Sequence, residues 1–301
     1  MIRLLPLLLL NSAASPAPFT LGDRGFASLQ EAVDAIGGGT GTIVVAPGMY
    51  RQCAVQRGGR VTYRAAEAGA AIFEGEACEG KAALVLRGEG SIVDGLVFRG
   101  YRVSDGNGAG IRSETGDLDV TNATFLDSQE GISGGEPAGQ RVTIDRSTFA
   151  GLGQCGEAPN CSHAIYLKNQ GSVRVTRSRF ERGTGGHYVK LRSPQVTIAD
   201  NSFDDSAGAK TNYMIDLPEG ARGEITDNVF VQGRAKENGS AMIAVRAESH
   251  TYPSAGLRIA NNAATIAPGG KATVFVADWS RERLAIGANR LGAGVKPFEV
   301  R

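Results

Sequence analysis

The sequence predicts an all-β fold, a single-stranded right-handed parallel β-helix with a capping helix at its N-terminal end. Three segments alternate apolar and polar residues, the pattern of a strand with one buried face: His163–Lys168, His187–Arg192 and Tyr213–Pro218. Each is followed by a second strand that ends in a Phe, namely Phe180, Phe203 or Phe230. No long helical segment separates these strands, which argues against an α/β fold. A β-sandwich is the alternative, but it does not explain the repeated unit.

Length and composition fit one repetitive domain in an exported protein. The 301 residues include 42 glycines, which suit many tight turns, and the net charge is +1. Arg3, the apolar run Leu4–Leu10 and the small residues after it predict a signal peptide over residues 1–17, followed by a β-helix domain over 18–301. The apolar run is shorter than the ~20 residues of a membrane span. We therefore expect a secreted or periplasmic monomer that binds no nucleic acid.

Four cysteines fit this compartment, because exported proteins commonly form disulfides. Cys155 and Cys161 flank a short loop that a bridge would order. Cys53 and Cys78 lie about one repeat apart, so that stacking brings them onto neighbouring coils. Metal binding is the alternative, but the sequence has no Cys-x-x-Cys pair and no His cluster beside them.

The elements follow in order along the chain. Phe26–Ile36 predicts an amphipathic helix, which would cover the apolar end of the stacked coils. The strand Gly41–Tyr50 ends in Pro-Gly-Met-Tyr, and this opening resembles that of pectate-lyase-like β-helix proteins, which implies a pectin-lyase-like solenoid. Further strands are expected at Arg60–Ala65, Ala71–Glu74, Ala83–Arg87 and Ser91–Phe98.

From Phe98 onward, strands ending in Phe recur, often after a polar pair such as Asp200-Asn201 or Asp227-Asn228. Stacked Asn residues at such corners predict ladders of side-chain hydrogen bonds. Weaker strands follow at Lys271–Trp279 and Leu284–Leu291. The Gly-rich segments between the strands, including those after Gly151 and Asp204, are expected to be loops that wall a cleft.

Alignment by the inward apolar residues places the outward side chains in rows along the solenoid. One row holds Arg112, Ser133, Tyr166, Lys190, Asp216 and Ala244, and the next holds Glu114, Gly135, Lys168, Arg192, Pro218 and Arg246. His163, His187 and Tyr213 align at the strand starts. The cations share one patch with few acids, which predicts an anionic ligand, and in an exported protein an acidic polysaccharide. The alternative is a solvated face with cations spaced by chance.

Cleavage of a uronate polymer by β-elimination would use these residue types. The carboxylate must be neutralised, a base must take the C5 proton, and an acid must protonate the departing oxygen. Arg192 suits the first role, Lys168 or Lys190 the second, and Tyr166 or His187 the third. Further contacts with the sugar are expected from Arg112, His163, Tyr188, Asp216 and Arg246.

Ile165–Asn169 followed by Val189–Ser193 resembles the paired strands of the alginate-lyase and chondroitinase-B type of β-helix lyase. The resemblance implies a lyase with Lys168 as base and Arg192 as acid. That family also binds calcium through acidic and Asn ligands on a preceding coil. No clear ligand set is evident in this sequence, so we expect no cofactor and leave calcium open. The stretch from His163 to Glu248 also resembles uncharacterised exported right-handed β-helix repeat proteins of bacteria, which implies the fold.

Two other functions remain open. A β-helix presents a long groove whether or not it cleaves a ligand, so a non-catalytic polysaccharide-binding or surface protein is one alternative. A glycoside hydrolase is the other, and it needs two carboxylates roughly 5–10 Å apart. Near the patch the sequence offers Asp204, Asp205 and Asp216 for that role.

Overall fold

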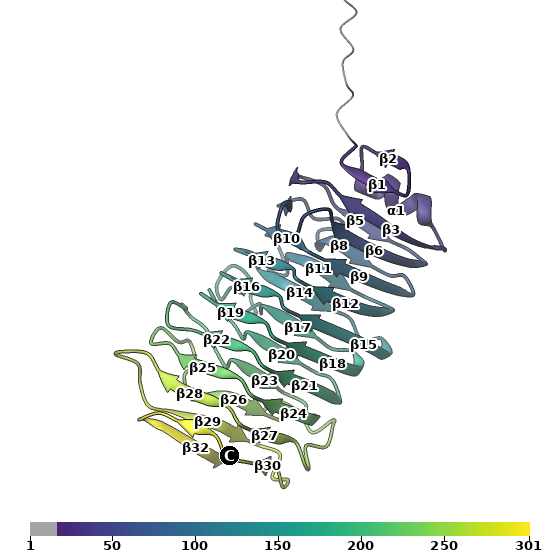
Figure 1. Ribbon diagram of the computed structural model, residues 1–301. Helices are drawn as coiled ribbons and strands as arrows, with labels where there is room; N and C mark the ends of the chain where they lie inside the picture. The colour runs from purple at the N-terminus through teal and green to yellow at the C-terminus, as the bar shows by residue number, and fades with distance from the viewer. Residues whose placement is uncertain (1–16) are drawn as a thin grey trace, which may run out of the picture.

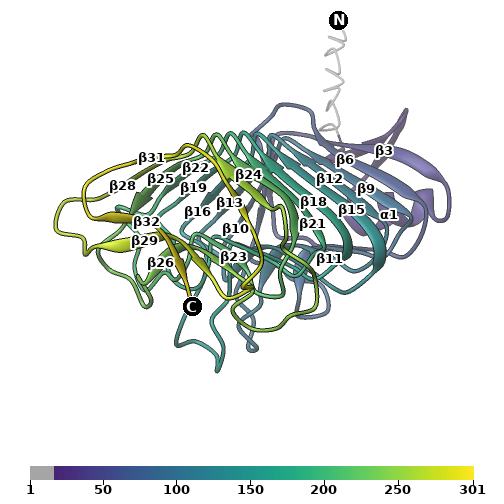
Figure 2. The same ribbon diagram turned by 90° about the horizontal axis from the view of Figure 1, so that it is seen from below.

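The computed structural model describes residues 17–301, so the predicted signal peptide lies outside the described residues except for residue 17. The chain winds as a parallel β-solenoid, in which one strand from each of three sheets makes up a coil (Figures 1 and 2). A single helix, α1 (Leu29–Ile36), lies at the N-terminal end of the described chain. The all-β fold with a capping helix is therefore confirmed.

The three sheets run the length of the solenoid. The twelve-stranded sheet contains β1 (Phe19–Leu21), β2 (Arg24–Phe26), β3 (Thr40–Val45), β6 (Arg60–Ala65), β9 (Gly90–Asp94), β12 (Asp117–Thr121), β15 (Ala138–Asp145), β18 (Gln170–Thr176), β21 (Gln195–Ala199), β24 (Arg222–Thr226), β27 (Arg258–Ala260) and β30 (Ala285–Ile286). One ten-stranded sheet contains β4 (Gly48–Tyr50), β7 (Ala71–Glu74), β10 (Leu96–Arg99), β13 (Thr124–Leu126), β16 (Thr148–Ala150), β19 (Arg179–Glu181), β22 (Ser202–Asp204), β25 (Val229–Gln232), β28 (Ala263–Ile266) and β31 (Arg290–Leu291). The other contains β5 (Ala54–Gln56), β8 (Ala82–Leu86), β11 (Ala109–Ser113), β14 (Glu130–Gly134), β17 (Ile165–Leu167), β20 (Val189–Leu191), β23 (Ile215–Leu217), β26 (Ala241–Val245), β29 (Thr273–Asp278) and β32 (Val295–Val300).

Two predicted boundaries need correction. Each strand predicted to end in a Phe is two strands from different sheets, for example β18 and β19, with a corner between them. At these corners one residue takes a left-handed conformation, with φ between 46° and 60° at Asn122, Arg146, Arg177, Asp200, Asp227 and Asn261. The helix begins at Leu29 rather than Phe26, because the Ser28 side chain caps it by accepting a hydrogen bond from the Glu31 N–H. Phe26 instead belongs to β2, which pairs antiparallel with β1.

The interior is filled by rows of apolar side chains. Phe rings from successive coils stack along the axis, and six consecutive centroid distances from Phe73 to Phe230 lie between 4.7 and 5.8 Å. The inward residues used for the alignment, such as Ile165 and Leu167, have no exposed surface. Burial of these side chains provides the main driving force for stacking the coils.

The corners are joined by the expected ladder of polar side chains. The Asn228 carboxamide oxygen accepts hydrogen bonds from both the backbone N–H and the Nδ2 of Asn201. In the same way, the side-chain oxygen of Asn262 accepts from the backbone N–H and the Nδ2 of Asn228, and that of Asn289 accepts from the same two groups of Asn262. These bonds satisfy buried backbone donors that the turn takes out of the sheets.

Both expected disulfides are present. Cys53–Cys78 joins neighbouring coils near the N-terminal end, and Cys155–Cys161 closes the short loop between β16 and β17. Within residues 17–301 no helix is long and apolar enough to cross a membrane.

Candidate functional site

The first of the two predicted outward rows is confirmed by the strand register. Arg112 pairs with Ser133, Ser133 with Tyr166, Tyr166 with Lys190, Lys190 with Asp216 and Asp216 with Ala244 across β11, β14, β17, β20, β23 and β26. Since parallel strands lie about 4.8 Å apart, this register brings side chains from different coils into one neighbourhood. The cation patch, formed by Lys168, Lys190 and Arg192, lies on the outer face of this sheet.

A cavity of about 530 Å³ opens on this face. Its floor carries His163, Tyr166, His187, Lys190 and Arg192. Its walls come from the loop before β11, which contributes Asp105 and Asn107, from the disulfide loop at Pro159–Cys161, and from Glu248. The expected wall after Gly151 is thus present, whereas no residue of the loop after Asp204 lines the cavity.

Tyr166 is the centre of the cation patch. Its ring centroid lies 5.9 Å from Lys168 Nζ, 5.8 Å from Lys190 Nζ and 5.9 Å from Arg192 Cζ, within the range of cation–π attraction. Arg192 Nε donates a hydrogen bond to the Tyr166 hydroxyl oxygen at 3.0 Å. Among residues 17–301 that hydroxyl donates to no acceptor, so its own proton is available to a ligand.

The expectation of a patch with few acids is wrong. Lys190 Nζ lies 3.4 Å from Asp216 Oδ2 and 2.6 Å from Glu248 Oε1. Arg192 contacts Glu219 at 2.7 Å and also pairs with Glu248. Lys168 pairs with Glu136 at 3.2 Å and does not line the cavity. The three glutamates come from segments outside the aligned strands, which is why the strand rows did not contain them.

A column of rings runs beside the patch. His163 and His187 lie 4.7 Å apart between centroids, and His187 stacks on Tyr213 at 5.4 Å. His163 Nδ1 accepts a hydrogen bond from the His187 backbone N–H, and His187 Nε2 lies 3.3 Å from Asp216 Oδ2. Burial, followed by the charge of Lys190, holds the pKa of His163 well below its usual range, and burial also lowers the pKa of His187. Neutral, buried His187 is therefore poorly suited to the predicted role of proton donor.

Two buried acids lie beside the cations: Glu130 in the cavity lining, and Asp216, a predicted ligand contact, under Lys190 and outside the lining. Burial raises the pKa of Asp216 to about 6. Burial also raises the pKa of Glu130, which lines the cavity, to about 8. Glu130 was missed by the sequence analysis, although a signal existed: since Ile132 pairs with Ile165, Glu130 occupies the same register position as His163, His187 and Tyr213. Extending that column by one coil would have found it.

Three more of the predicted contact residues lie outside the cavity lining. Tyr188 is 2% exposed, and its hydroxyl donates to Asp205 Oδ1 at 2.8 Å inside the solenoid, so its placement on the ligand face is corrected. Arg246 is paired with Glu282 and lies outside the cavity lining. Arg112 also lies outside the lining, with its Nε 3.7 Å from Glu114.

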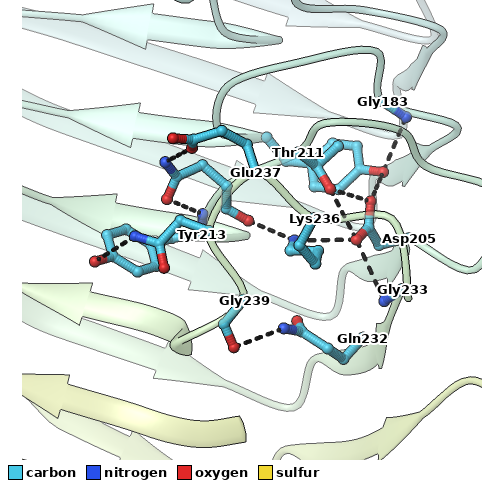
Figure 3. A network of polar contacts seen from close by, with 12 residues as sticks. Gly183, Asp205, Thr211, Tyr213, Gln232, Gly233, Lys236, Glu237 and Gly239 are labelled. Carbon is cyan, nitrogen blue, oxygen red and sulfur yellow. Dashed lines mark hydrogen bonds and ion pairs between the residues drawn. The ribbon is translucent and has the colours of Figure 1, made fainter. Parts of the chain in front are cut away.

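Tyr213 is held in place by a buried polar network (Figure 3). Lys236 Nζ pairs with Asp205 Oδ2 at 3.0 Å and donates to the backbone oxygen of Asn212. The Asn212 side-chain oxygen in turn accepts from the Tyr213 N–H at 2.8 Å. The network joins the loops after β22 and β25, and none of its residues lines the cavity.

Within the described residues, no group of three or more His, Cys, Asp or Glu side chains is arranged to hold a metal ion. Of the cavity carboxylates, Glu248 is paired with cations, Glu130 is buried, and Asp105 is exposed and accepts a hydrogen bond from the Asn107 N–H.

Comparison with known proteins places the fold. A structure titled "a new PL6 alginate lyase complex with trisaccharide" is 16% identical, with a TM-score of 0.58 over 90% of this chain and 58% of that chain. This chain thus spans less than two thirds of the length of that lyase, and the likeness is one of fold. The surface protein and adhesin PfbA of Streptococcus pneumoniae is 11% identical, with a TM-score of 0.38 over 90% of this chain and 94% of that chain. No curated protein sequence matches.

A family model described as "Right handed beta helix region" matches residues 82–267. This span includes the cavity floor and most of the coils, and it agrees with the predicted hand of the solenoid. The chain belongs to the right-handed β-helix family.

Proposed function

We propose that this chain is an exported protein that binds an acidic, uronate-containing polysaccharide in the cavity and cleaves it by β-elimination. The observation that carries the proposal is Tyr166, ringed by three cations on the floor of an open cavity, with its hydroxyl proton free. The two disulfides support export, because such bonds are typical of secreted and periplasmic proteins. The fold shared with an alginate lyase is compatible with this chemistry.

The residues divide the reaction between them. Lys190 and Arg192 would neutralise the uronate carboxylate, which makes the C5 proton more acidic. Lys168, which lies beside Tyr166 but outside the cavity lining, would take that proton as the C4–O bond breaks and the C4=C5 double bond forms. Tyr166 would give its proton to the departing oxygen. The family resemblance assigns the last step to Arg192 instead, and Tyr166→Phe distinguishes the two assignments.

The test measures two products on the same samples. Alginate, pectate, hyaluronan and glucuronan are each incubated with the protein, with and without calcium. Ultraviolet absorbance reports the unsaturated uronate, and a reducing-end assay reports any cleavage. We expect both signals from at least one polymer. Binding without either signal would support the non-catalytic alternative, and reducing ends without absorbance would contradict elimination.

Variants then test the assigned roles. Lys168→Ala, Arg192→Ala and Tyr166→Phe should each lower the absorbance signal by about 100-fold or more, the usual contribution of a general acid or base. Arg258→Ala is the matched control, because Arg258 is a half-exposed arginine of β27 that pairs with Glu224, away from the cavity lining. Full activity in Tyr166→Phe would remove Tyr166 from the proton-donor role and favour Arg192.

Glycoside hydrolysis is a second candidate, favoured by one observation. Glu130 and Glu248 line the same cavity with pKa values displaced in opposite directions. Burial raises the pKa of Glu130, whereas for Glu248 burial is outweighed by hydrogen bonds from Lys190 and Arg192, which lower its pKa. A protonated acid and an ionised one that line the same cavity are the two groups that hydrolysis requires. Of the carboxylates expected for this role, Asp205 is buried in the polar network instead.

A further inference from the structure

We infer that Glu248 occupies the carboxylate subsite of the cavity and acts as an intramolecular competitor of the acidic ligand. Glu248 follows β26, two coils beyond β20, yet its side chain reaches back across β23 to Lys190 and Arg192. Its backbone N–H donates to the Pro218 oxygen at 2.9 Å, so the segment that carries it is anchored to the intervening coil. The side chain is thereby directed over the cation pair.

The contacts of Glu248 are those that a bound uronate would make. One carboxylate oxygen accepts from Lys190 Nζ at 2.6 Å, and the other accepts from Arg192 Nη2. Each oxygen thus uses a different cation, and together these contacts hold the carboxylate at two points. A ligand carboxylate in the same place would restore the same balance of charge.

Exposure shows which partner can be displaced. The side chains of Lys190 and Arg192 are 9% and 18% exposed, whereas that of Glu248 is 45% exposed. Glu248 is therefore the outermost member of the cluster and lies between the cations and solvent. Glu248 is the member that a ligand can reach from solvent, so a ligand carboxylate can take its place on the two cations.

The floor remains paired when Glu248 leaves. Lys190 keeps Asp216, and Arg192 keeps Glu219 and the Tyr166 hydroxyl. Loss of Asp216, by contrast, would remove the buried partner of Lys190. The structure thus separates a permanent acid beneath the cations from a replaceable acid above them. The inference rests on the proposed acidic ligand but not on its cleavage.

The test is a direct binding measurement. Isothermal titration of sodium glucuronate and of tetragalacturonate, with glucose as the uncharged control, is carried out on the full chain and on Glu248→Gln and Glu248→Ala. We expect both variants to bind the acidic sugars about tenfold more tightly than the parent, with no change for glucose. Glu224→Gln is the matched control, because Glu224 is 42% exposed and pairs with Arg258 on the twelve-stranded sheet. Its affinity should equal that of the parent.

The outcomes separate this inference from the proposed cleavage. Unchanged or weaker binding in both Glu248 variants, or no binding by any of the proteins, would overturn the inference, and weaker binding would make Glu248 a ligand contact or a hydrolytic carboxylate. Tighter binding without an unsaturated product from any polymer would uphold the competitor role and reject elimination. Thermal unfolding of each variant shows whether the fold is retained.

Discussion

The interior and the outer face of the same coils obey different rules. Inside, Phe149, Phe180 and Phe203 repeat one residue type with rings nearly parallel, 8° apart at each step. Outside, the same three coils place Ser133, Tyr166 and Lys190 at a single register position. Packing requires the repeat inside, whereas outward positions are free to differ. The candidate site therefore lies where the repeat is lost, and the repeat itself serves to position it.

The largest effect is expected where the interior row is broken. Phe180→Ala removes a ring with no exposed surface that contacts Phe149 and Phe203, with centroids 4.9 and 4.7 Å away. We expect the free energy of unfolding to fall by about 3–5 kcal/mol, as measured by urea denaturation. Tyr166→Phe, which removes only a hydroxyl from the outer face, should cost less than about 1.5 kcal/mol. Equal losses in the two variants would show that the two faces do not differ in this way.

An intermediate effect is expected at the corners. Asn228→Ala takes away the acceptor of the Asn201 N–H and the donor to the Ile198 oxygen, both buried. Because buried polar groups without a hydrogen-bond partner destabilise the fold, we expect the free energy of unfolding to fall by about 2–3 kcal/mol. Asn289 lies at the partly exposed end of the ladder, so Asn289→Ala should lower the free energy of unfolding less than Asn228→Ala does. Thermal unfolding of both variants measures the difference. The reverse order would mean that the corner residues do not act through burial.

The smallest effect, taken over one pH unit, is a pH dependence of stability at the cavity floor. The pKa of Glu130 is about 8 in the folded chain and 4.5 by its usual value, so between these pH values the folded state binds more protons than the unfolded state. Stability should therefore fall as the pH rises across this window, by at most about 1.4 kcal/mol per pH unit from this group. Glu130→Gln should abolish that fall. Melting temperatures of both proteins from about pH 4 to about pH 9 would show it, and parallel profiles would contradict it.

The difference between the interior and the outer face also explains how much of the site the sequence could predict. Side chains in a strand alternate with a period of two, so the inward residues Ile165, Val189 and Ile215 were enough to place Tyr166, Lys190 and Asp216. Glu248 and Glu219 could not be placed, because they lie in connections whose reach across coils has no period. The expected imbalance of charge failed for this reason. Tyr188 is buried although it shares the outward parity of Lys190, because it lies at a bend just before β20, outside the strand in which side chains alternate.

The polar ladder gives the solenoid a direction. In Asn201, Asn228 and Asn262 the Nδ2 group donates toward the next coil, so the amide dipoles all point the same way along the axis. Aligned amides polarise one another, and each bond strengthens its neighbours. Each of these coils therefore presents the same donor to the coil that follows it and receives the same kind of bond in return. A coil can therefore be added to or removed from this part of the solenoid without a new kind of contact between coils. The coils that carry the cavity differ from the others in their loops.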